Sequence, residues 1–236
     1  MAEQKARTVL VTGANRGLGL EFVRQYAADG WKVHAACRSP KSAKELKALQ
    51  SQHAGSMSIL ALDVTDADSI RSAAAQLRGE ALDLLLNNAG VGSPPAQRIG
   101  TLDYAAWARV LDTNVLGPAR VTEAFVGNVA QGGGKRIVTL TSRMGSIGDN
   151  SSGGSYAYRS SKAGINAVMK SFSIDLAPRG ITCVVVHPGW VRTDMGGAGG
   201  KLAPAESVKA LRKLIESLTA KDAGKFFDYD GSELPW

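Results

Sequence analysis

The sequence predicts an α/β fold: a doubly wound, mostly parallel sheet of seven strands with helices on both faces. Short apolar runs rich in valine, leucine and isoleucine alternate with longer amphipathic or alanine-rich stretches. The apolar runs lack the polar–apolar alternation of half-exposed strands, so each is expected to be buried on both faces of a helix-covered sheet. A glycine-rich segment, residues 13–19, follows the first run, where a strand would turn into a helix.

Each element is assigned from one of these runs or stretches. Strands are expected at Thr8–Val11, Lys32–Ala36, Met57–Leu62, Leu82–Leu86, Arg136–Leu140, Ile181–Val186 and Lys225–Phe227. Helices are expected at Gly19–Asp29, Ser42–Gln50, Ala67–Leu77, Tyr104–Val129, Ala157–Ala177 and Ala205–Leu218. Because crossovers between parallel strands are right-handed, the expected strand order is 3-2-1-4-5-6, with the seventh strand at the edge. No repeat or long linker interrupts residues 1–236, which are expected to form a single domain.

Composition and charge limit the kinds of partner. Among 236 residues with 44% apolar content, no stretch approaches the roughly eighteen apolar residues of a membrane span. Residues 1–7 leave no room for a signal sequence before the first apolar run. The net charge of +7 is scattered among acids, which favours a phosphate-bearing cofactor over a nucleic acid as the anionic partner. Cys37 and Cys183 show no metal-ligand spacing, so no metal is expected, and the thiols indicate a reducing, cytoplasmic compartment.

The segment Thr12–Gly19, TGANRGLG, has the composition of a phosphate-binding turn. Backbone can approach a pyrophosphate closely only where side chains are absent, and a helix N-terminus supplies free N–H groups. The glycine spacing is G-x-x-x-G-x-G rather than the commoner G-x-G-x-x-G. A glycine-rich turn alone can be purely structural, but its place after the first strand of a Rossmann-type sheet favours dinucleotide binding.

The end of the second predicted strand bears on the choice of dinucleotide. A site for NAD usually places an acid there, to bond the ribose 2′-hydroxyl. Here Cys37 carries no charge and Arg38 follows it, while Arg16 lies within the glycine-rich loop. Arginine can bond a 2′-phosphate bidentately, whereas an acid would repel it. Either arginine alone can be a solvated surface group, but together they favour NADP (NADPH) over NAD.

A serine and a Tyr-x-x-x-Lys pair follow the fifth predicted strand. Tyr158 and Lys162 are four residues apart, which places them on one face of a helix. An ammonium near a phenol lowers the phenol pKa from about 10, so the tyrosine can exchange a proton with a carbonyl or alcohol oxygen. Ser142 ends an apolar run and could hold the same oxygen. Taken alone, a Tyr-x-x-x-Lys pair is common on surface helices.

The order of these motifs resembles that of the short-chain dehydrogenase/reductase family over nearly the whole chain. The further shared features are Asp63–Val64, Asn87 to Gly90, Asn114, and Pro188–Gly189 followed by Thr193. Within that family, SRMGSIGDNSSGGSYAYRSSKAGIN, HPGWVRTDMGG and GKFFDYDGSELPW are most similar to the C-factor and sniffer-type carbonyl reductases. The resemblance implies an NADPH-dependent oxidoreductase that reduces an aldehyde, ketone or quinone.

The resemblance also implies a catalytic set of Ser142, Tyr158, Lys162 and Asn114. Tyr158 would act as general acid and base, and Lys162 would lower its pKa while bonding the nicotinamide ribose. Ser142 would position the substrate oxygen. Asn114 would hold a water that links Lys162 to solvent, although an asparagine within a helix can equally be a polar residue that bends it.

For the cofactor, the resemblance assigns one group of residues to each part of the dinucleotide. Asp63 and Val64 would meet the adenine, the segment 88–90 the adenine-side ribose, and Asn87 would instead brace neighbouring strands. Gly189, Val191 and Thr193 would hold the carboxamide. The full expected set is Gly13, Asn15, Arg16, Gly17, Leu18, Gly19, Arg38, Asp63, Val64, Asn88, Ala89, Gly90, Tyr158, Lys162, Pro188, Gly189, Val191 and Thr193.

Four features leave the substrate open. Arg143 either places a cation near the pocket mouth, favouring acidic or dicarbonyl substrates, or faces solvent. His187 is a second acid or, like most lone histidines at the end of a strand, a structural group. Trp190 lines the pocket or packs under its loop. The segment between Thr193 and Ala205 is short and glycine-rich, where many relatives carry a helical lid, so an open site for bulky substrates is expected.

Two other functions are compatible with the same residues. One is an alcohol dehydrogenase working in the oxidative direction, and the other is a dinucleotide-binding, C-factor-like signalling protein. The intact catalytic set argues against a pure sensor, which needs no acid/base tyrosine. A small carbonyl compound is the expected partner, rather than a nucleic acid or a membrane. Relatives often pair through the two helices expected at 104–129 and 157–177, whose alanine-rich surfaces predict a homodimer or homotetramer.

Overall fold

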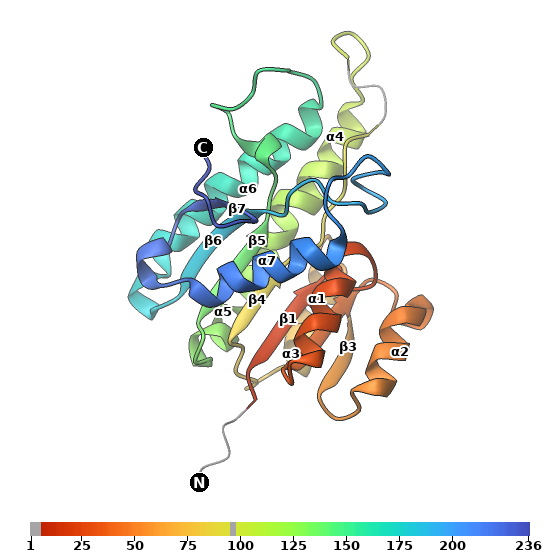
Figure 1. Cartoon of the computed structure of the whole chain (residues 1–236), viewed down its shortest axis with the longest axis vertical. Coiled ribbons are helices and arrows are strands. Elements are labelled where there is room, and N and C mark those ends of the chain that lie inside the picture. Colours follow the sequence, from red (N-terminus) through yellow and green to blue (C-terminus); the bar gives the residue numbers. More distant parts are fainter. Residues whose placement is uncertain (1–5, 95–97) are drawn as a thin grey trace.

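The seven predicted strands form one sheet in a computed structural model that describes residues 6–94 and 98–236 (Figure 1). They are β1 (Thr8–Thr12), β2 (Lys32–Cys37), β3 (Met57–Ala61), β4 (Leu84–Asn87), β5 (Arg136–Leu140), β6 (Thr182–His187) and β7 (Phe226–Asp228). The order is β3-β2-β1-β4-β5-β6-β7, and each neighbouring pair is parallel. The predicted fold class and strand order are confirmed.

Helices cover both faces of the sheet (Figure 1). Successive side chains of a strand point to opposite faces, so the apolar side chains on each face are removed from water only if helices pack on both. Helices α1, α2 and α7 pack on one face, and α3, α5 and α6 on the other. None of the helices in the described part of the chain has the length and apolarity needed to cross a membrane. The helices are α1 (Gly17–Ala28), α2 (Lys44–Gln52), α3 (Ala67–Gln76), α4 (Tyr104–Leu111), α5 (Gly117–Gln131), α6 (Tyr156–Asp175) and α7 (Pro204–Ser217), with 3₁₀ turns at Pro40–Ser42, Arg143–Gly145, Ala177–Arg179 and Ala220–Asp222.

The predicted helix over residues 104–129 is two helices. A π turn, Asp112–Leu116, separates α4 from α5, and the N–H of Gly117 donates to the carbonyl oxygen of Asp112 five residues earlier. Pro118 follows at the start of α5, where a residue without an N–H is tolerated. A π turn inserts an extra residue into the helical repeat. At its centre lies Asn114, buried to 1% exposure.

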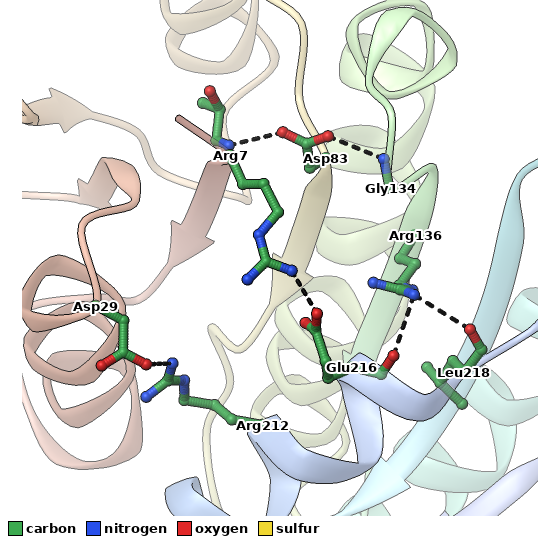
Figure 2. Close-up of polar contacts among 9 residues, drawn as sticks. Arg7, Asp29, Asp83, Gly134, Arg136, Arg212, Glu216 and Leu218 are labelled. Atoms are coloured by element: carbon green, nitrogen blue, oxygen red, sulfur yellow. Dashed lines mark hydrogen bonds and ion pairs between the residues drawn. The ribbon is translucent and has the colours of Figure 1, made fainter. Parts of the chain in front are cut away.

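Polar contacts tie the amino ends of the strands to α7 (Figure 2). Arg7 pairs with Glu216, and Arg136 donates to the carbonyl oxygen of the same residue at 3.2 Å. Asp83 accepts from the N–H of Thr8 at 2.8 Å and from that of Gly134 at 2.9 Å, which links β1 to the turn before β5. These contacts stabilise the amino-end edge of the sheet, which is opposite to the edge formed by the carboxyl ends of the strands.

Candidate active site

Two cavities with shared lining lie at the carboxyl ends of the strands, the edge at which doubly wound sheets bind ligands. The narrow groove, of about 220 Å³, is lined chiefly by the loops that follow β1, β2, β3 and β4. The wide cavity, of about 880 Å³, is lined chiefly by the segments that follow β5 and β6 and by the start of α6. Tyr158 lines both, so its side chain lies where the two spaces meet.

The glycine-rich loop closes one wall of the narrow groove. Gly13 has a φ of 64°, and a Cβ there would lie 2.8 Å from the Cα of Ala89. A Cβ on Gly19 would lie 2.3 Å from the carbonyl oxygen of Gly13, so neither position admits a side chain without movement. The side chain of Asn88 donates to the carbonyl oxygens of Thr12 and Gly13, at 2.8 and 3.1 Å. These features hold backbone close to the groove, as a phosphate cradle requires.

The structure gathers most of the predicted cofactor residues around these cavities. All of them except Gly19 line the groove or the wide cavity. Gly19 instead lies against the loop backbone, where its lack of a side chain permits the turn. Sequence reasoning gave Thr12 no role, yet its hydroxyl accepts from the N–H groups of Asn88 and Ala89, at 3.0 and 3.1 Å. The sequence feature that could have indicated this role is the position of Thr12 directly before Gly13, at the start of the glycine-rich loop.

Both arginines expected to select the dinucleotide lie at the groove. Arg38 follows β2 and lines the groove, and no described residue forms an ion pair with it. Arg16 pairs with Asp194 at 2.9 Å, which joins the glycine-rich loop to the segment after Thr193. Both side chains of this pair are largely exposed, so the ion pair contributes little stability and can exchange for another anion.

Ser142 and Tyr158 both line the wide cavity. Ser142 is buried two residues after the end of β5, and its hydroxyl oxygen accepts from the N–H of Met144 at 3.1 Å. Removal of the phenol from water raises the pKa of Tyr158 above its ordinary value of 10.0, and the nearby hydroxyl of Ser142 partly offsets that effect. Tyr158 therefore keeps its proton at neutral pH, as a proton donor must.

Lys162 lies behind the tyrosine in the same helix. Its ammonium donates to the carbonyl oxygen of Leu140 at 3.0 Å and lies 5.6 Å from the centroid of the Tyr158 ring. Burial lowers the pKa of Lys162 to about 8. The role of Lys162 in lowering the pKa of Tyr158 stays a prediction; the largest influence on that pKa in the structure is removal of the phenol from water, which raises it.

Asn114 lines neither cavity but is bonded to Val91, which lines both. Its amide nitrogen donates to the carbonyl oxygen of Val91 at 2.9 Å and to the hydroxyl of Ser161 at 3.0 Å, and its oxygen accepts from the N–H of Val91 at 2.9 Å. A Cβ on Gly90 would lie 3.2 Å from that oxygen and 3.9 Å from the nitrogen of Lys162. Asn114 thus clamps the loop after β4 to α6, close to the lysine.

Three residues with open roles are placed by the structure. Asn87 donates to threonine hydroxyls on α5 and β5, at 3.0 and 3.2 Å, so it braces the neighbouring strand, as predicted, and a helix as well. Trp190 lines the wide cavity, and its indole nitrogen also donates to the carbonyl oxygen of Gly196 at 2.8 Å, so it both lines the pocket and holds the loop. His187 lines the same cavity, but burial lowers its pKa to about 4, which makes it a poor proton donor at neutral pH.

Comparisons with known proteins agree with this geometry. The family model described as short chain dehydrogenase matches residues 7–201. The C-signal protein of Myxococcus xanthus is 46% identical over 155 residues, which are 66% of this chain and 93% of that protein. The carbonyl reductase Sniffer of D. melanogaster is similar with a TM-score of 0.92 and 35% identity, over 98% of this chain and 100% of that one. The NADPH-bound carbonyl reductase from chicken fatty liver gives 0.91 and 36%, over 99% and 100%.

Proposed function

This chain belongs to the short-chain dehydrogenase family, and on that premise we propose that it is an NADPH-dependent carbonyl reductase acting on an aldehyde, ketone or quinone. The observation that carries the proposal is the place of Tyr158, a half-buried phenol that lines the wide cavity together with Ser142, where the narrow groove meets that cavity. A cofactor in the groove and a substrate in the cavity would meet at this residue. The similarity to carbonyl reductases supports the same reaction.

The residues of the groove fit NADPH. Side chains are excluded at Gly13 and Gly19, so the backbone of this loop can approach a pyrophosphate closely. Arg16 and Arg38 supply cations for a 2′-phosphate. Asp63 and the other predicted groove residues would hold the adenosine end. NADPH, when bound, supplies the hydride. The NADPH-bound chicken carbonyl reductase, 36% identical, supports this assignment.

The chain itself would supply the proton and the orientation. The phenol of Tyr158 would donate a proton to the carbonyl oxygen as negative charge develops there, and Ser142 would hold that oxygen by a hydrogen bond. Lys162 would bond the ribose of the cofactor from its buried position, which Asn114 helps to fix. The side chain of Asn114 is engaged with Val91 and Ser161, which supports the positioning role more directly than a water-holding one.

A screen of NADPH oxidation over aldehydes, ketones, quinones and dicarbonyls tests the proposal. We expect turnover with at least one class, and slower oxidation of the matching alcohols with NADP⁺. Faster alcohol oxidation at neutral pH would assign the chain instead as an alcohol dehydrogenase.

The similarity to C-signal favours a signalling role as the second candidate. NADPH binding without turnover of any carbonyl compound would support that role and contradict the reductase.

NADPH is expected to be preferred over NADH. The exposed guanidinium of Arg38 has no described ion-pair partner, and Cys37 puts no negative charge beside it. A charge-assisted bond contributes about 1.5–3 kcal/mol, so we expect a preference of about 10-fold or more in kcat/KM. Measurement of both cofactors for wild type and for the double variant Cys37→Asp/Arg38→Ala should show the preference lost or reversed. Arg179→Ala, in the turn after α6, is the control, and equal use of both cofactors by wild type would contradict the prediction.

The oligomeric state stays a prediction. Tyr104 and Leu116 are exposed on the segment that leads from α4 into α5, and Ile174 is exposed near the end of α6. Burial of such side chains between subunits would support a homodimer or homotetramer. Light scattering at micromolar concentration is expected to give a dimer or tetramer, and a monomer would contradict the prediction.

A further inference from the structure

The arginines that line the wide cavity differ in whether a carboxylate pairs with them. Three arginines line it among the described residues, and two of them are paired. Arg16 pairs with Asp194 at 2.9 Å. Arg143 pairs with the nearly buried carboxylate of Asp228 at 2.9 Å and lies 3.8 Å from that of Asp149. The charge of Arg143, which the sequence offered for acidic substrates, is therefore already compensated within the chain.

Arg159 is the third arginine of the cavity and has only neutral partners. It follows Tyr158 in the first turn of α6. Its Nε donates to the carbonyl oxygen of Gly153 at 3.3 Å, its Nη2 to the hydroxyl of Ser152 at 2.8 Å, and its Nη1 to the carbonyl oxygen of Met144 at 3.5 Å. In the part of the chain that the structure describes, no carboxylate forms an ion pair with this guanidinium.

These bonds leave the guanidinium with capacity for one more ligand. An arginine has five N–H donors, and three of them are used here, one on each nitrogen. One N–H group therefore remains on each of Nη1 and Nη2. A carboxylate accepts bonds from guanidinium donors in a planar arrangement, and a guanidinium already held by its loop loses less freedom on binding it. Arg159 is thus preorganised for an anion.

The position of Arg159 separates it from the reacting group. Adjacent residues of a helix point in different directions, so Arg159 and Tyr158 contact different parts of a ligand in the same cavity. A cavity of about 880 Å³ accommodates a ligand with a carbonyl at one end and an anionic group at the other. His187 adds no competing charge, because its lowered pKa keeps it neutral at pH 7.

We propose that Arg159 is a specificity-determining residue that selects carbonyl substrates carrying a carboxylate remote from the reacting carbonyl. The inference rests on the proposed carbonyl reductase function and names the substrate class of that site. It assigns to Arg159 the role that the sequence alone offered to Arg143.

Two aldehydes of nearly equal shape test the proposal: 4-carboxybenzaldehyde, which is anionic, and its methyl ester, which is neutral. The wild type is expected to prefer the acid. Arg159→Gln removes the cation and should lower kcat/KM for the acid by about 10- to 100-fold, mainly through KM, while the ester is little changed. Arg159→Lys keeps the charge but not the planar group, so it should restore part of the preference for the acid. Added salt should weaken the preference of the wild type.

The alternative is that Arg159 only holds the loop at residues 144–153. Equal losses for acid and ester in both variants would establish that role and overturn the proposal, as would no change for either substrate in Arg159→Gln. A second readout needs no turnover: benzoate binding followed by tryptophan fluorescence, to which Trp190 in the same cavity contributes. Benzoate should bind wild type and fail to bind Arg159→Gln even if neither aldehyde is reduced, an outcome that would contradict only the reductase function. Equal binding to both proteins would overturn the proposal.

Discussion

Tyr158→Phe is expected to lower kcat by about 10²–10⁴-fold, the usual contribution of a positioned general acid. The variant keeps the ring that lines both cavities but loses the phenol hydroxyl, the proposed proton donor. Cofactor affinity should change little, because the groove backbone and its arginines are untouched. Steady-state turnover on the best carbonyl substrate from the screen, together with NADPH titration, checks both parts.

The matched control is Tyr156→Phe, two residues earlier in α6, which removes a hydroxyl outside both cavities. It should leave kcat unchanged. Ser142→Ala should lower kcat without weakening NADPH binding, because its proposed partner is the substrate oxygen. Since burial raises the pKa of Tyr158, kcat/KM should not fall with rising pH until well into the alkaline range. Near-wild-type turnover in Tyr158→Phe would mean that the proton comes from another group, and the mechanism would be wrong.

Lys162→Met is expected to abolish turnover and, at the same time, to stabilise the protein measured without cofactor. Because burial lowers the pKa of Lys162 from 10.5 to about 8, keeping its charge inside the fold costs up to about 3 kcal/mol at neutral pH. Methionine fills a similar volume without a charge. The free energy of unfolding at pH 7 should therefore rise by up to that amount, less the contribution of the lost bond to Leu140. Urea unfolding of both proteins measures the difference.

The pH dependence gives a second test of the same substitution. The unfolded chain holds the lysine proton up to about pH 10.5, whereas the folded chain releases it above about pH 8. In that window the unfolded state binds more protons, so the free energy of unfolding of the wild type gains a rising contribution with pH. The advantage of Lys162→Met should be full below about pH 8 and vanish toward pH 10.5. Lys170→Met, at an exposed site of α6, is the control, and a loss of stability in Lys162→Met at pH 7 would contradict the prediction.

The strand order and the groove were predictable because both depend on local patterns. An apolar run buried on both faces carries its signal in consecutive residues, and the crossover rule then orders the strands. The glycines of the loop at 13–19 predict that its backbone lies close to another group, and in the structure a side chain at Gly13 would clash with the backbone of Ala89. The π turn at Asp112–Leu116 was not predictable, since the helical pattern continues through it and only packing fixes the extra residue.

The electrostatics of the site were decided by the tertiary structure. The spacing of Tyr158 and Lys162 suggested a lowered phenol pKa, but burial of the tyrosine raises it instead. Burial depends on every segment that packs around a group, so it cannot be inferred from the spacing of two residues in the sequence. The charge of Arg143 is balanced by Asp228, which lies 85 positions away in sequence and reaches it only because β7 ends beside β6. The sequence shows which residues are charged, but the fold decides which of them pair. Among the arginines of the wide cavity, the described residues leave Arg159 without a carboxylate partner.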